Sequence, residues 1–272
     1  MRKMGAVPIF SLGACGPAVV ALQRKLLKRG FNPGALDGEF GLGTEAALRA
    51  FQNSESLVAD GVAGPRTLAA LEKRKPPPLH SSAARFTVQV VARMFPHTPL
   101  GNIKRNLPAV LGALVKAKLA DRLMVLMALA TVRAETESFE PVAEGRSRYN
   151  TSPSGHPFDL YDARRDLGNR AKPDGERYRG RGYVQLTGRF NYAKFSKALG
   201  LGSTLVTQPD LASDPAIAGR LLAAFLGAHE RAIKEALLAA DYAGARKLVN
   251  GGRHGLERFT DAFVTGAALV PA

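Results

Sequence analysis

The feature that most constrains the fold is a helical segment without a polar face. Between Leu123 and Val132 almost every residue is apolar, within the longer stretch ALVKAKLADRLMVLMALATVRAE. A helix that is hydrophobic all round must be enclosed by other elements, so we expect a buried central helix in a large domain. An acid-rich stretch, RAETESFEPVAEG, begins where this helix ends, and it contains Glu135, Glu137, Glu140 and Glu144.

Two of these glutamates are expected to have different environments. Glu135 extends the stripe of Met124, Ala128 and Thr131, whereas Glu137 lies about 200° further round an ideal helix. A carboxyl group at the end of an apolar core loses hydration, and the negative end of the helix dipole further disfavours its charge. We therefore expect Glu135 to keep its proton and to act as a general acid. The alternative is a buried ion pair with a nearby arginine, and helical spacing alone favours that alternative.

The first part of the chain contains a repeat. The segments DGEFGLGT, from Asp37, and DGVAGPRT, from Asp60, share the pattern D-G-x-x-G-x-x-T. The Asp-Gly steps predict tight turns, and Thr44 and Thr67 are expected to be helix N-caps. A further helix is expected to begin at Pro17 and to stop at Gly30. The pattern predicts three short helices joined by Asp-Gly turns.

A proline-rich segment, EKRKPPPLHSS, follows this helical part. Consecutive prolines favour a stiff, extended spacer. We therefore expect a domain over residues 1–72, a linker over 73–83 and a second domain over 84–272.

The first domain resembles the peptidoglycan-binding domain family. The resemblance is carried by GPAVVALQRKLLKRGF, LDGEFGLGTEAALRAFQ and VADGVAGPRTLAAL, and it covers roughly Leu12 to Leu71. It implies a module that binds the bacterial cell wall and has no catalytic role of its own.

The second domain resembles glycoside hydrolase family 19, the chitinase and phage-endolysin lysozyme family. The segment YRGRGYVQLTGRFNY is similar to the signature of that family. The segments YDARRDLGNRAKPDGERYRGRG, QPDLASDPAIAGRLLAAFL and KLVNGG also match the family in this order, so the resemblance covers roughly Leu123 to Phe263. It implies an α-rich, lysozyme-like (α+β) catalytic domain within a mainly α chain. Without the resemblance, YVQLTG reads as strand-like.

The resemblance also implies catalytic roles. Glu135 corresponds to the acid of the family, and Glu144, nine residues later, corresponds to the base that activates water. Thr187 matches the hydroxyl residue that helps to hold this water. The family inverts, which requires roughly 6.5–9.5 Å between the two carboxyl groups. The sequence departs from the family at Ala134, where a His is usual, and at Glu137-Ser138, where a Gly pair is usual.

Other residues are expected to surround the substrate. Gln185, Asn191 and Asn250 match family positions that hydrogen-bond sugar. Tyr183 and Phe190 are expected either to contact sugar rings or to belong to the core. We expect Arg181 and Arg189 to fix the loop or to pair with Glu144 rather than to contact substrate.

Composition limits the remaining possibilities. The formal net charge is +15, which implies a polyanionic partner such as nucleic acid, anionic lipid or cell wall. No apolar run approaches the roughly 20 residues that a membrane-spanning helix needs. Cys15 is the only cysteine, so no disulfide forms within the chain. No histidine pair has zinc-ligand spacing, and we expect neither a metal nor a cofactor.

These features together predict a modular, phage-type endolysin that hydrolyses peptidoglycan. We expect a monomer that also binds the anionic cell envelope and has no specific nucleic-acid partner. The start MRKMGAVPIFSLGAC has only a short apolar part broken by Pro8, so we expect no cleaved signal peptide. Synthesis in the host cytoplasm and later release to the periplasm and cell wall are expected. The alternatives are a chitinase of the same fold and a wall-binding protein with an inactive hydrolase domain.

Overall fold

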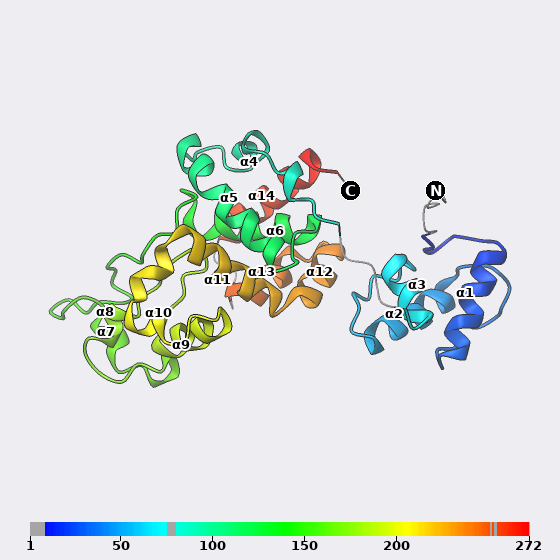
Figure 1. Ribbon diagram of the computed structural model, residues 1–272, viewed down its shortest axis with the longest axis horizontal. Coiled ribbons are helices and arrows are strands. Elements are labelled where there is room, and N and C mark those ends of the chain that lie inside the picture. The colour runs from blue at the N-terminus through cyan, green and yellow to red at the C-terminus, as the bar shows by residue number, and fades with distance from the viewer. Residues whose placement is uncertain (1–8, 75–79, 251, 253–254, 272) are drawn as a thin grey trace. The chain divides into compact units, whose positions relative to one another are not determined.

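The protein is predominantly helical, as expected. The computed structural model describes residues 9–74, 80–250, 252 and 255–271 (Figure 1). Within these residues, β pairing is limited to isolated antiparallel bridges between Phe10 and Ala63, Cys15 and Glu39, and Ala143 and Arg181. No helix in the described part of the chain has the length and apolar character needed to cross a bilayer.

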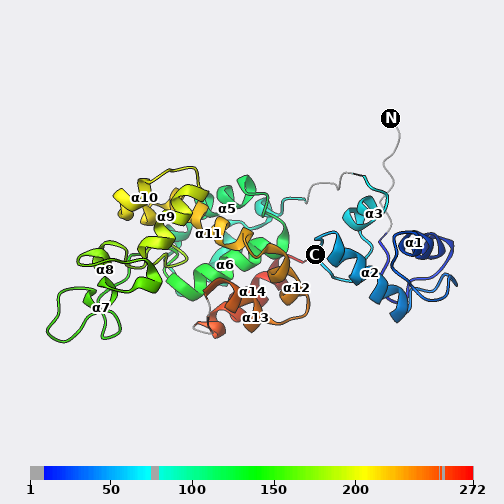
Figure 2. The same cartoon turned by 90° about the horizontal axis from the view of Figure 1, so that it is seen from below.

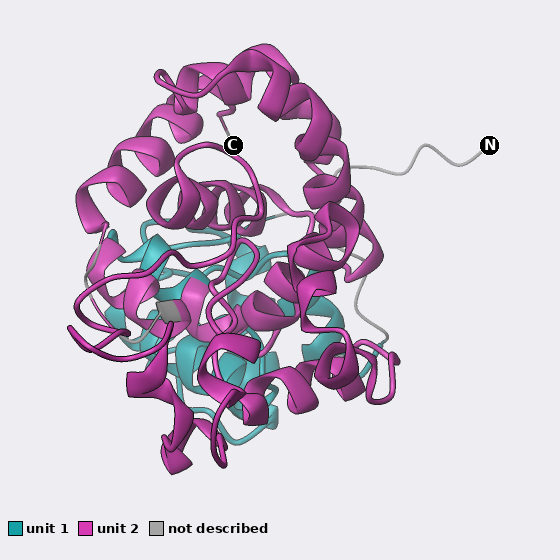
Figure 3. Ribbon diagram, turned by 90° about the vertical axis from the view of Figure 1, so that its left-hand side faces the viewer, with its two compact units in different colours: residues 1–79, 234–240 teal, residues 80–233, 241–272 magenta. Residues whose placement is uncertain are grey.

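The chain divides into two compact units, coloured separately in Figure 3. One comprises residues 1–79 and 234–240, and the other comprises residues 80–233 and 241–272. Residues 75–79 of the expected linker lie outside the described residues, and the expected boundaries at residues 72 and 84 stay a prediction.

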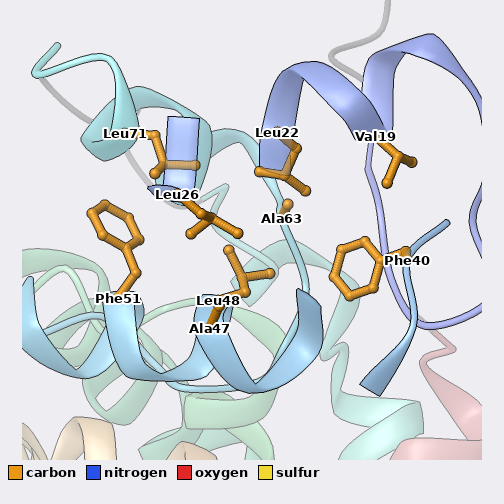
Figure 4. Packing of buried hydrophobic residues seen from close by; sticks show 9 residues of the cluster. All are labelled: Val19, Leu22, Leu26, Phe40, Ala47, Leu48, Phe51, Ala63 and Leu71. Atoms are coloured by element: carbon orange, nitrogen blue, oxygen red, sulfur yellow. The ribbon is translucent and has the colours of Figure 1, made fainter. Parts of the chain in front are cut away.

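The first unit contains α1 (Pro17–Lys28), α2 (Leu42–Ser54) and α3 (Pro65–Leu71). Pro17 opens α1, and Gly30 follows its last turn with a φ of 87°, a conformation that glycine adopts without steric cost. The side chains that the three helices bury pack against each other and against the two Asp-Gly loops (Figure 4). The core consists of Val19, Leu22, Leu26, Phe40, Ala47, Leu48, Phe51, Ala63 and Leu71.

Each Asp-Gly loop is fixed by a buried glutamine from the preceding helix. The Gln23 amide nitrogen lies 3.0 Å from Asp37 Oδ1 and 3.1 Å from Thr44 Oγ1, and Gln23 Oε1 accepts a hydrogen bond from the Gly38 N–H. Gln52 repeats this arrangement with the second loop, at Asp60, Thr67 and Gly61. Both glutamines are only 1% exposed. Their hydrogen bonds satisfy polar groups of each turn that would otherwise be buried without a partner.

The two threonines are not N-caps, so that prediction is wrong. The caps are Gly41 and Gly64, and helices α2 and α3 begin at Leu42 and Pro65. Thr44 and Thr67 lie within the first turns and are buried. Their hydroxyl groups accept from the buried glutamines, which act across the loop instead of capping along the chain.

The second unit is built around α6 (Arg122–Thr136), whose N-cap Asp121 accepts a hydrogen bond from the Met124 N–H. Every residue from Met124 to Ala134 is buried, which confirms the expected central helix. In Figure 2, α6 lies between α11 (Pro215–Gly227) and α14 (Leu256–Leu269), and it contacts both. A Cβ at Gly266 of α14 would lie 2.6 Å from Leu126, so glycine permits this close packing.

Residues 234–238 belong to the first unit, and the other elements after residue 80 cover this centre or extend to one side of it. Helices α7 to α10 lie together at the left in Figures 1 and 2, and their own core includes Tyr178, Leu186, Tyr192 and Phe195. The bounds are η1 (Ala83–Arg85), α4 (Val88–Met94), α5 (Leu100–Lys116), α7 (Asp159–Asp162), η2 (Arg165–Leu167), α8 (Asp174–Arg177), α9 (Arg189–Ala198), α10 (Thr204–Thr207), η3 (Pro209–Ser213), α12 (Glu230–Leu238) and α13 (Tyr242–Asn250).

The prediction that YVQLTG is strand-like is also wrong, because residues 182–185 form a turn and no residue from 183 to 188 belongs to a strand before α9 begins. The Arg181 N–H donates to the Leu186 carbonyl at 3.2 Å, and the Leu186 N–H donates back to the Arg181 carbonyl at 2.9 Å. Gln185 has a φ of 49° inside this closed loop. Leu186 therefore uses its backbone N–H and carbonyl within this loop and not in pairing with a neighbouring strand.

We predict that Gln52→Ala destabilises the first unit by about 2–3 kcal/mol, because several buried polar groups lose a partner at once. The chain has no tryptophan and its tyrosines begin at Tyr149, so hydrogen exchange read by mass spectrometry is the suitable probe. Amides 60–64 should exchange faster, and those of residues 37–41 should change less. Arg24→Ala, at an exposed position beside Gln23, is the control. Wild-type exchange at residues 60–64 in the Gln52 variant would show that the glutamine does not hold the turn.

Candidate active site

Glu135 lies in the last turn of α6 and forms an ion pair with Arg246 of α13. The distance from Arg246 Nη2 to Glu135 Oε1 is 2.6 Å. The Arg246 side chain is fully buried, and the Glu135 side chain is 14% exposed. The ion pair weighed from the sequence is thus present, and the partner comes from a helix 111 residues later. The contact fixes the direction of the Glu135 carboxyl group.

Glu137 ends α6 with a backbone φ of 27° and has different partners from Glu135, as their angular separation predicts. Its carboxylate pairs with the buried Arg133 and, at 2.9 Å, with Arg258 of α14. The hydrogen bond from Arg258 and then that from Arg133 lower the pKa of Glu137, against a partial loss of hydration that raises it. Glu137 is therefore a paired carboxylate that closes the helix end.

The segment after Glu137 returns to the core before it reaches the next glutamates. Phe139 is fully buried and makes edge contacts with Phe95 and Tyr183. Tyr183 is itself fully buried, which favours the core alternative for this residue. Phe190 is 62% exposed, so its ring is open to a ligand. Glu140 pairs with Arg105 at 2.9 Å, and both side chains are partly exposed.

Glu144 is held by three donors and by a backbone pairing. Its N–H donates to the Gly180 carbonyl at 2.7 Å, and the Gly180 N–H donates to Glu144 Oε2 at 3.1 Å. The other carboxylate oxygen, Oε1, accepts from Asn150 Nδ2 at 2.9 Å and from the Tyr161 hydroxyl at 3.1 Å. These are neutral donors, so the carboxylate is oriented by hydrogen bonds instead of an arginine.

The sequence offered a pairing of Arg181 or Arg189 with Glu144, and this prediction is wrong because both arginines pair with other carboxylates. Arg181 is buried, donates to the Arg177 carbonyl and pairs with Asp210 at 2.7 Å. Arg189 pairs with Asp174 at 3.3 Å. Arg181 fixes the loop from inside, which was the other role expected of it.

Three candidate site residues converge on Gly180. A Cβ placed on Gly180 would lie 2.8 Å from Gln185 Oε1, 3.2 Å from Glu144 Oε2 and 3.2 Å from Thr187 Oγ1. Since all three oxygens lie within 3.2 Å of one point, they face one another across the glycine. Any larger residue at position 180 would occupy the place where these oxygens meet.

Further hydrogen bonds join these residues into one cluster. The Thr187 hydroxyl donates to the Gln185 carbonyl at 2.9 Å, and Asn191 Nδ2 donates to the Thr187 carbonyl at 2.8 Å. The Gln185 amide nitrogen donates to the Gly182 carbonyl, which leaves Oε1 directed toward Gly180. The cluster thus contains Glu144, Gln185, Thr187 and Asn191, whereas Glu135 belongs to the interface of α6 and α13. The side chain of Asn250, at the end of α13, lies outside the described residues.

Sequence reasoning missed four contributors to this arrangement. Arg246, Asn150 and Tyr161 are the side chains that hold the two glutamates, and Gly180 provides the shared space. Gly180 and Tyr161 had a signal, because both lie in the segment YDARRDLGNRAKPDGERYRGRG, whereas Arg246 and Asn150 lie outside the matched segments. No group of histidine, cysteine, aspartate and glutamate side chains suited to a metal ion occurs among the described residues.

We predict that Glu137→Gln lowers stability at neutral pH by about 1 kcal/mol at most, because its partly exposed ion pairs are screened by solvent. A lowered pKa means that this contribution is present above the ordinary value of 4.5 and is lost as the pH falls below it. Melting temperatures of variant and wild type should differ at pH 7, and the difference should shrink as the pH falls below 4.5. Glu140→Gln, which removes one exposed pair, should have a smaller effect. A difference that stays the same size from pH 7 to pH 3 would contradict the charge-based explanation.

Comparison with known proteins shows what the first unit resembles. Residues 15–71 match the family described as a putative peptidoglycan binding domain. The spore cortex-lytic enzyme of Bacillus cereus is 45% identical over 65 residues, which is 24% of this chain and 25% of that protein. The N-acetylmuramoyl-L-alanine amidase CwlM of Mycobacterium tuberculosis is 46% identical over 62 residues, which is 23% of this chain and 15% of that protein. The matches thus span a quarter or less of these relatives.

Solved structures also show similarity to the chain. Chitinase C from Streptomyces griseus has a TM-score of 0.43 and 18% identity, over 72% of this chain and 80% of that one. A Burkholderia AP3 phage endolysin has a TM-score of 0.27 and 21% identity, over 96% of this chain and 100% of that one. The chain therefore joins a segment that matches a peptidoglycan-binding domain to a second helical unit that holds the Gly180 cluster.

Proposed function

We propose that the protein is a cell-wall hydrolase that cleaves β-1,4 glycosidic bonds of peptidoglycan by an inverting acid/base mechanism. The observation that carries this proposal is the convergence of Glu144 Oε2, Thr187 Oγ1 and Gln185 Oε1 at Gly180. A carboxylate and a hydroxyl that lie this close to each other can share one water molecule, which is what the base side of an inverting glycosidase requires.

In this mechanism Glu144 is the base. The Thr187 hydroxyl hydrogen is donated to the Gln185 carbonyl, so Thr187 Oγ1 is left as an acceptor. A water molecule can donate one hydrogen to Glu144 Oε2 and the other to Thr187 Oγ1, which directs a lone pair away from both. As this water attacks the anomeric carbon, its proton passes to Glu144 and the glycosidic C–O bond breaks.

Glu135 is the proposed acid, and it supplies a proton to the leaving oxygen of the sugar. Arg246 contacts Oε1, so the proton is assigned to the other carboxyl oxygen. Gln185, Asn191, Asn250 and Phe190 are proposed sugar contacts, whereas the buried Tyr183 is assigned to the core.

The substrate is proposed to be peptidoglycan instead of chitin because of the segment at residues 15–71. The net charge of +15 suits an anionic envelope and predicts binding that weakens with salt. We further propose a monomer of the endolysin type that is made in a host cytoplasm and acts at the periplasm and cell wall.

A second candidate is a wall-binding protein whose hydrolase unit is inactive. The ion pair between Glu135 and Arg246 favours it, because a carboxylate held by a buried arginine also has a purely structural explanation. The two candidates share the wall-binding segment and differ in whether Glu135 transfers a proton.

We predict that Glu135→Gln lowers glycan cleavage by a factor on the order of a thousand, since general acid catalysis supplies about 10²–10⁴. Mass spectrometry of muropeptides released from purified peptidoglycan measures this loss and identifies the new ends. Glu137→Gln is the matched control, because it neutralises a carboxylate two residues away and should retain most activity.

The same preparations distinguish the alternatives. The inactive candidate requires that wild-type protein bind purified walls and release no muropeptides, and that it leave the turbidity of outer-membrane-permeabilised cells unchanged. A chitinase would release reducing sugar from chitin faster than from peptidoglycan. An inactive Glu137 variant beside an active Glu135 variant would overturn the assignment of the acid.

A further inference from the structure

We infer that Tyr161 is a positioning residue that acts through Glu144. It donates a hydrogen bond to Oε1 of that carboxylate, so that Oε2 is the oxygen that takes part in the reaction. The inference rests on the proposed function, in which Glu144 is the base. Tyr161 and Asn150 both donate to Oε1, at 3.1 Å and 2.9 Å. With this oxygen occupied from two elements, Oε2 is the atom left to accept a proton from water.

Asn150 can present only its NH₂ group to Glu144. It is fully buried, and its Oδ1 accepts from the Ser147 N–H at 2.8 Å and from the Thr151 hydroxyl at 2.9 Å. Its Nδ2 donates to the Gly145 carbonyl as well as to Glu144. A flipped amide would place an oxygen against two acceptors, so this network fixes the donor.

Tyr161 can only donate as well. Burial and then the nearby charge of Glu144 raise the pKa of Tyr161 to about 12, so its hydroxyl keeps its proton at neutral pH. The residue lies on α7, and Asn169 Nδ2 donates to its carbonyl at 2.8 Å. The hydroxyl therefore reaches Glu144 from a chain segment separate from the loop that carries Asn150.

Oε2 has the surroundings that catalysis requires. It accepts from the Gly180 N–H at 3.1 Å and lies 3.2 Å from the place of a Cβ on Gly180, which Thr187 Oγ1 and Gln185 Oε1 approach to 3.2 Å and 2.8 Å. The simpler explanation is that Glu144 only anchors the loop to Gly180. The two explanations differ in one measurable respect. If Glu144 is only an anchor, loss of the Tyr161 hydroxyl should not change how the reaction rate depends on pH. If Glu144 is the base, the Tyr161 hydrogen bond stabilises its ionised form, and loss of the hydroxyl should change that dependence.

The test is Tyr161→Phe in the full chain, assayed by reducing ends released from soluble, peptide-free glycan strands. A hydrogen bond to a charged group is lost, so kcat should fall about tenfold while KM stays within about twofold of wild type. The acidic limb of the kcat–pH profile should move to higher pH, because a base without this donor is ionised less readily. Thermal unfolding should show that the variant is folded at the assay temperature.

Tyr178→Phe is the matched control. It removes a hydroxyl that donates to the Val206 carbonyl at 3.2 Å, and that carbonyl keeps a contact with Arg177 at 3.3 Å. This variant should retain wild-type kcat and an unmoved pH profile.

The outcomes separate the inference from the proposed function. If wild type cleaves and Glu144→Gln is inactive, the proposed function stands. Tyr161→Phe with kcat within twofold of wild type, or with an unmoved acidic limb, would then overturn the inference alone. If wild-type protein releases no reducing ends, the proposed function fails first.

Discussion

The enclosure of α6 is the constraint on which the second unit depends. Its side chains are buried on every face, so the helices around it must close over the full length of the apolar run. The charged residues of the helix are confined to its first and last turns. This places the glutamates of the acid-rich stretch beside the core, and it explains why they are distributed among defined partners instead of forming a solvated surface run.

Partner choice gives these glutamates different chemistry. Glu135 and Glu137 are paired with arginines from α13, α6 and α14, and Glu140 pairs with an exposed arginine of α5. Glu144 is held by an asparagine, a tyrosine and a backbone N–H. An arginine partner compensates much of the charge of a carboxylate, whereas the donors that hold Glu144 are neutral. This contrast supports the proposal that Glu144 is the base.

The first unit shows how a short repeat is stabilised without a large core. Each Asp-Gly loop buries several polar groups, and the side-chain amide of one glutamine forms hydrogen bonds with them. The local pattern D-G-x-x-G-x-x-T predicts the turn, but the glutamine lies 14 residues before the first Asp and eight before the second. This unequal spacing conceals the repeated interaction from a local reading of the sequence.

The sequence by itself determined the features that depend on local chemistry. These are the buried helix between Leu123 and Val132, the helix from Pro17 to its stop at Gly30, the turns at Asp37 and Asp60, and the grouping of Gln185, Thr187 and Asn191 in one motif. Only the tertiary structure decided which atoms meet. Arg246 reaches Glu135 from 111 residues away, and Tyr161 and Gly180 reach Glu144 from 17 and 36 residues away. Such contacts depend on how the helices pack against each other, and this packing leaves no periodic pattern in the amino-acid sequence.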